Sequence, residues 1–172
     1  TEKENGSYKF QGQNFKNVSF NFLDEIDKKL MPNRKIERLA FPFPYNYPCD
    51  FDSSNKYVSN QVNNQSGSHN LILINPLMKK NEIIKSLQKS KAIGFKPYRT
   101  YSITGDIINC RIFDFITENQ IALANEKKLI IMMHLAKKDG VADDENINDL
   151  IYLSEKYPDV KWILAHCARS YS

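Results

Sequence analysis

Two stretches of this 172-residue chain decide its fold: Lys128-Leu-Ile-Ile-Met-Met-His134 and Lys161-Trp-Ile-Leu-Ala-His166. Each is a short apolar run that ends in a histidine, and runs of this length predict buried strands. Between them, Glu145–Lys156 carries apolar residues at helical spacing, with Asp143 or Asp144 as its cap, and therefore predicts a helix. A strand, a helix and a second strand indicate a βαβ unit with parallel strands.

The same alternation extends towards the N-terminus. Three more strands are expected, at Ile36–Phe43, Asn70–Ile74 and Ala92–Lys96. Four more helices are expected, and each is amphipathic: Asn17–Leu30, Ser54–Asn64, Lys79–Ser90 and Ile112–Asn125. Strands that alternate with helices predict a parallel sheet. We expect a single α/β domain over residues 1–172.

Composition and charge exclude several classes of protein. The apolar runs are far shorter than the ~20 residues of a membrane span. The net charge of +4 comes from lysines spread among acidic residues, without the basic stripe of a nucleic-acid-binding protein. Three cysteines without a CxxC pair disfavour a disulfide framework. The same cysteine pattern fits a reducing cytoplasm, which is the expected location. There is no initiator Met, so we expect that the given sequence starts inside a longer one.

Two α/β architectures compete, the open doubly wound sheet and the (β/α)8 barrel. A doubly wound nucleotide-binding sheet usually shows a glycine-rich phosphate turn, and this chain has 6 glycines and neither GxGxxG nor GxxxxGK[ST]. A barrel has no such requirement and keeps its catalytic side chains at the carboxyl ends of its strands. The unusual residues of this sequence fall at those ends, which favours the barrel.

The two strand-ending histidines are the strongest candidates for a site. Alternation along a strand places Ile130 and Met132 on the same face as His134, and Trp162 and Leu164 on the same face as His166. On neighbouring strands both histidines would point into one mouth, as metal ligands or as a general acid or base. One such histidine alone is more often structural, but its repetition in successive units favours a site. His69 precedes a strand and is given no function.

Three basic residues also follow strand ends. Lys96 ends its strand and is predicted to point towards the mouth of His134, where it could bind an anionic substrate or, if carbamylated, bridge two metals. A lysine that extends from the rim into water is the alternative. Arg99 and Arg169 could hold a carboxylate in a bidentate manner, and a surface role remains equally open for both. Cys167 is expected to turn towards the helices, away from His166.

Several stretches resemble the amidohydrolase-related metal-dependent hydrolases, which are (β/α)8 barrels: Ile93-Gly-Phe-Lys-Pro-Tyr98, the strand ending at His134, Leu153–Pro158, and Trp162–Arg169. The similarity extends from Ile74 to Ser172 and is most specific just before His166. The resemblance implies that His134 is the metal ligand ending the fifth strand. It implies that His166 ends the sixth strand, as a second ligand or as the acid/base. Lys96 falls on the fourth strand, where some members hold a carbamylated lysine.

The departures from the family pattern matter equally. The chain has no His-x-His motif, and its five expected strands match the second to the sixth of a barrel that needs about 250 residues. We therefore expect a partial (β/α)8 barrel, inactive alone, from a metal-dependent hydrolase or decarboxylase that uses zinc or manganese on a small organic substrate. A non-catalytic structural or binding module is the alternative. Exposed sheet edges would favour a homo-oligomer.

Overall fold

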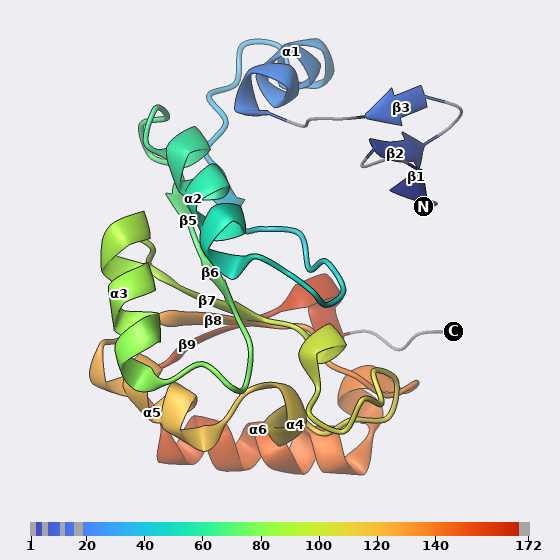
Figure 1. Cartoon of the computed structure of the whole chain (residues 1–172), viewed down its shortest axis with the longest axis vertical. Coiled ribbons are helices and arrows are strands. Elements are labelled where there is room, and N and C mark those ends of the chain that lie inside the picture. The colour runs from blue at the N-terminus through green and yellow to red at the C-terminus, as the bar shows by residue number, and fades with distance from the viewer. Residues whose placement is uncertain (1–2, 5–6, 11–12, 16–18, 169–172) are drawn as a thin grey trace.

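The computed structural model describes residues 3–4, 7–10, 13–15 and 19–168 (Figure 1). It is an α/β protein in which parallel strands alternate with helices, as the sequence predicts. The N-terminal part adds three short antiparallel strands that the sequence pattern did not predict: β1 (Lys3–Glu4), β2 (Ser7–Phe10) and β3 (Gln13–Phe15). With two to four residues each, these strands are too short to show a clear alternation.

The parallel strands follow one another in chain order. β4 (Leu39–Ala40) pairs with β5 (His69–Asn70). The next four strands form one sheet in the order β6 (Ile72–Ile74), β7 (Gly94–Pro97), β8 (Ile130–Met133) and β9 (Lys161–Leu164). The two sheets meet at Leu71, whose N–H donates to the Ala40 carbonyl, while Asn70 accepts from Ile93. The first expected strand shrinks to two residues, and at its carboxyl end Pro42 cannot donate to a ladder.

Six α-helices connect and cover the described strands: α1 (Phe20–Leu30), α2 (Phe51–Val62), α3 (Lys80–Ser90), α4 (Ile112–Phe115), α5 (Glu118–Glu126) and α6 (Asp144–Lys156). The single helix expected at Ile112–Asn125 is wrong. Ile116 is extended, and the Thr117 hydroxyl then accepts from the N–H of Gln120 in a capping box that starts a new helix. None of the helices within residues 19–168 is long and apolar enough to cross a membrane.

The two faces of the parallel sheet differ in character. Helices α3, α5 and α6 follow one another around one face (Figure 1), which we call the helix face. Its buried strand residues alternate along each strand and pack against Ile83, Ile121 and Leu153 of those helices: Ile72, Ile74, Phe95, Ile131 and Met133. Alternation places Lys96 and Met132 on the opposite face, which we call the site face.

The edge of β6 beyond the end of β4 is paired by a side chain. Asn55 of α2, which is 2% exposed, accepts from the N–H of Leu73 at 2.7 Å and donates to the Leu73 carbonyl at 3.2 Å. The amide therefore makes the two hydrogen bonds that another strand would make. It anchors α2 to the sheet and leaves neither buried backbone group unpaired.

We predict that Asn55→Ala lowers the free energy of unfolding by about 2 kcal/mol, because two buried backbone groups lose their partners. Asn64 is the matched control: it is exposed, and its amide donates only to the Asn60 carbonyl of the preceding turn. Asn64→Ala should cost less than about 0.5 kcal/mol. Urea denaturation of both variants checks this, and equal losses would contradict the role given to Asn55.

Candidate functional site

The structure brings His134 and His166 together. His134 directly follows β8 and His166 lies two residues after β9, and the register pairs Met133 with Leu164 at the ends of these strands. The two ring centroids are 5.1 Å apart, with an interplanar angle of 81°. His134 is half-buried and His166 is exposed. The prediction that the two histidines meet at the carboxyl ends of neighbouring parallel strands is confirmed.

The route by which His166 reaches this position differs from the prediction. Trp162 pairs with Ile131 and packs against the helix-face core, so strict alternation would carry His166 to the helix face. The strand instead ends at Leu164, and residues 166–168 adopt left-handed φ values of 54° to 55°. This turn places His166 beside His134. Cys167 lies in the same turn and is exposed, not buried against the helices.

Lys96 joins the two histidines from β7, the strand before that of His134, as predicted. Its side chain is 1% exposed, and its Nζ donates to the Met132 carbonyl at 3.1 Å. The same nitrogen lies 4.1 Å from the ring centroid of Tyr98 and 5.7 Å from that of Phe41. Within the described residues, no carboxylate forms an ion pair with Lys96. The alternative of a lysine extended into water is wrong.

Burial lowers the pKa values of Lys96 and His134, and neighbouring positive charges lower that of His134 further. Burial lowers the pKa of Lys96 to about 7. Burial also lowers the pKa of His134 to about 4, with further contributions from the positive charges of Lys96, Arg99 and His166. His134 is therefore a neutral imidazole at pH 7 and offers a lone pair. Tyr98 stacks on this ring, with centroids 5.9 Å apart and an interplanar angle of 27°.

The other residues singled out in the sequence have different outcomes. Arg99 begins the short helix η1 (Arg99–Tyr101), is half-buried, and is near enough for its charge to act on His134. Arg169 lies outside the described residues. Asp143 caps α6 by accepting from the N–H groups of Glu145 and Asn146, as predicted. Sequence reasoning gave no role to Tyr98, although its position two residues after Lys96 places it next along the same strand end.

The described residues do not form a complete metal site. No group of three or more His, Cys, Asp or Glu that could hold a metal occurs in the part of the chain that the structure describes. His134 and His166 supply two nitrogen donors, whereas a catalytic zinc site uses about three protein ligands and a water.

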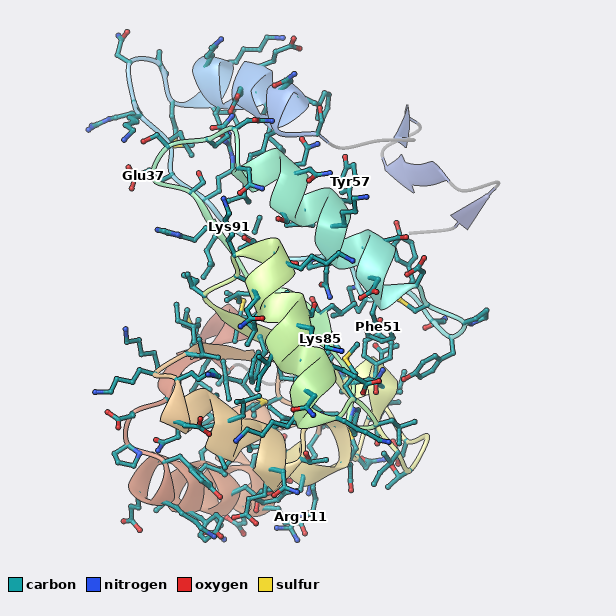
Figure 2. The ribbon with its side chains drawn as sticks, turned by 60° about the vertical axis from the view of Figure 1, so that its left-hand side comes forward. Glu37, Phe51, Tyr57, Lys85, Lys91 and Arg111 are labelled. Atoms are coloured by element: carbon teal, nitrogen blue, oxygen red, sulfur yellow. The ribbon has the colours of Figure 1, made fainter. Side chains whose placement is uncertain are left out.

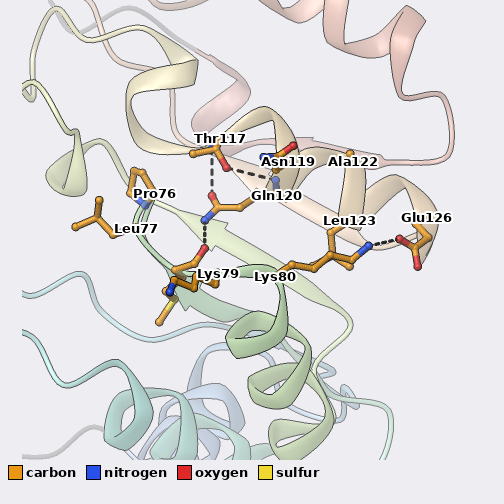
Figure 3. A pocket seen from close by; sticks show the side chains of 11 residues that line it. Pro76, Leu77, Lys79, Lys80, Thr117, Asn119, Gln120, Ala122, Leu123 and Glu126 are labelled. Atoms are coloured by element: carbon orange, nitrogen blue, oxygen red, sulfur yellow. Dashed lines mark hydrogen bonds and ion pairs between the residues drawn. The ribbon is translucent and has the colours of Figure 1, made fainter.

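A separate pocket of about 560 Å³ lies between α5 and the segment that joins β6 to the start of α3 (Figure 3). Sequence reasoning missed it, because none of its lining residues forms a recognisable motif. Its central polar residue, Gln120, donates to the carbonyls of Asn75 and Met78 and accepts from the N–H of Thr117. Lys80 and Glu126 pair at one side. These polar groups already have partners in the protein, so we base no function on this pocket.

Comparisons with protein-family models, curated proteins and solved structures gave no match for this chain. The family resemblance noted in the sequence therefore stays a prediction.

We predict that His134 makes the protein less stable in acid. Unfolding returns the imidazole of His134 to an ordinary pKa near 6.5. Between about pH 6.5 and pH 4 the unfolded chain therefore binds a proton at this ring and the folded chain does not. The contribution of neutral His134 to the free energy of unfolding is complete above about pH 6.5 and is lost as the pH falls towards about 4. His134→Gln should lose less stability between pH 7 and about pH 5 than the natural chain, in urea denaturation.

His69→Gln is the control for this prediction, because His69 is exposed on β5. It should keep the pH dependence of the natural chain. An unchanged pH dependence in His134→Gln would show that this imidazole titrates alike in the folded and unfolded chains.

Proposed function

We propose that this chain is part of a metal-dependent hydrolase of the amidohydrolase type, built on part of a (β/α)8 barrel. The observation that carries the proposal is the pair of histidine rings, 5.1 Å apart, at the carboxyl ends of β8 and β9. Active sites of barrel enzymes lie at this end of the strands. The strand order also supports a barrel, because β4 to β9 proceed without the reversal that marks a doubly wound sheet.

The two histidines fit a metal centre in part. Neutral imidazole is a common ligand of zinc, and His134 is neutral at pH 7. A further donor has to come from outside the described residues. When bound, a divalent ion such as zinc or manganese would polarise the substrate and lower the pKa of a bound water. We derive no reaction step through the ion, because the donor set is incomplete.

The other residues of the site have separate roles in this proposal. His166 is exposed, so it can exchange a proton with a substrate as general acid or base. Lys96 and Arg99 present positive charge to an anionic group of a small organic substrate, and Arg169 would add a second guanidinium. Tyr98 fixes the orientation of the His134 ring by stacking on it.

The same observations are compatible with two other functions. A decarboxylase of the same family would use the same positive charges to hold the carboxylate that leaves. A non-catalytic binding module is favoured by one observation: no three or more His, Cys, Asp or Glu of the described residues form a group that could hold a metal. Self-association through a sheet edge is a further proposal: within the described residues β9 pairs only with β8, and Trp162, Ile163 and Leu164 are partly exposed.

We predict that this chain binds zinc or manganese only weakly, with a dissociation constant above the micromolar range, because two donors give little coordination energy. Calorimetric titration of the 172-residue chain measures this. His134→Ala and His166→Ala should each abolish the binding that is present. His69→Ala removes a histidine that lies on β5, outside the site, and should leave the binding unchanged.

Two results would contradict this account. Submicromolar binding that is lost in His134→Ala would mean that the chain carries a complete site. Binding that survives in both site variants would mean that the two histidines are not metal ligands, and the hydrolase proposal would then lose its main support.

A further inference from the structure

We propose that the amino group of Lys96 is a nucleophile that condenses with small carbonyl compounds, an aldehyde or a 2-oxo acid, to form an imine. This goes beyond the proposed hydrolase, in which Lys96 serves only as a positive charge. The inference rests on the surroundings of this amine at the end of β7: it is enclosed by protein, faces two aromatic rings, and has no carboxylate partner within the described residues.

The enclosure distinguishes Lys96 from lysines at the surface. Lys80 and Lys156 are about half exposed and pair with Glu126 and Glu118, so their ammonium forms keep both water and a counter-charge. Lys96 is 1% exposed, and within the described residues its Nζ donates to the Met132 carbonyl at 3.1 Å. A lysine that loses water without gaining a counter-charge holds more of its amine in the neutral form, which is the nucleophile. A pKa of about 7 for Lys96 agrees with this reasoning.

The condensation is balanced without an added oxidant or reductant. The nitrogen lone pair of neutral Lys96 attacks the carbonyl carbon, and the oxygen takes up a proton while the nitrogen releases one, which gives a carbinolamine. Protonation of the hydroxyl lets it leave as water while the nitrogen lone pair forms the C=N bond, and loss of the remaining nitrogen proton gives the neutral imine. The net reaction joins the amine and the carbonyl compound and releases one water.

Two aromatic rings lie beside the amine of Lys96, so the smallest carbonyl compounds are the most suitable probes. The rings of Tyr98 and Phe41 lie over the amine, and Phe41 is half-buried at the start of residues 41–50, a segment without helix or strand. A two-carbon compound is therefore the appropriate probe. Acetaldehyde and glyoxylate share the reacting aldehyde, and glyoxylate adds a carboxylate that the positive charge of Arg99 would attract.

The test is reductive trapping on the unmodified chain. The protein is treated with acetaldehyde or glyoxylate and cyanoborohydride at pH 7 and at pH 9, and the alkylated lysines are located by peptide mass spectrometry. Lys85 and Lys91 at the exposed side and end of α3 provide internal controls (Figure 2). We expect Lys96 to be alkylated first at pH 7. A fully solvated lysine gains neutral amine roughly 100-fold between these pH values, so the ratio of Lys96 to Lys85 labelling should fall steeply at pH 9.

Two outcomes would overturn the proposal. Lys96 that is labelled only after unfolding in guanidinium would show that the amine cannot be reached in the folded protein. A constant ratio of Lys96 to Lys85 labelling would show that Lys96 is an ordinary amine. Lys96→Met should remove this adduct alone and serves to assign it. Metal titration is independent of this experiment, so failure of the imine proposal and failure of the hydrolase proposal are separate results.

Discussion

The amino group of Lys96, whose protonated form is positively charged, is buried without a counter-charge among the described residues, and the arrangement at the carboxyl ends of the strands depends on how the protein tolerates it. Moving an ammonium group out of water costs several kcal/mol unless polar groups replace the lost water. Here the replacements are the Met132 carbonyl and the face of the Tyr98 ring. The ring of Phe41, in the segment after β4, also lies beside this amine, with its centroid 5.7 Å from the nitrogen. The same charge acts on His134 and helps to keep its imidazole neutral.

The two faces of the parallel sheet separate stability from chemistry. The helix face carries Ile and Phe side chains that are fully buried beneath α3, α5 and α6, and burial of this kind supplies most of the free energy of folding. The site face carries Lys96 on β7, and the residues that follow β8 and β9 bring in the two histidines. Because the strands are parallel and consecutive, the carboxyl ends of three neighbouring strands bring these side chains to one edge of the sheet. Substitutions at the site therefore need not disturb the main core.

What the sequence could predict depended on whether a residue stays within a regular element. Lys96 and His134 were placed correctly because β7 and β8 keep strict alternation up to or next to them. His166 was placed in the right neighbourhood by an incorrect argument, because its position depends on a left-handed turn that alternation cannot reveal. The break before α5 does have a local signal, the capping box of Thr117 and Gln120. The apolar spacing over Ile112–Asn125 is nevertheless continuous enough to predict a single helix. The pairing of Asn55 with Leu73 joins residues far apart in sequence, so no local pattern could show it.

The charges around His134 also restrict what the proposed site can bind. Lys96, Arg99 and His166 all lower its pKa, and the described residues contribute no carboxylate to that balance. A metal cation at the two imidazoles would meet these same positive charges. An anionic substrate would offset them, so under the proposed function binding of the metal and binding of the anion favour each other. Such coupling is reciprocal: whatever factor the anion adds to metal affinity, the metal adds to anion affinity. Under the proposed function, the buried lysine would therefore do more than bind a carboxylate, because it would make occupation of the metal site depend on the substrate.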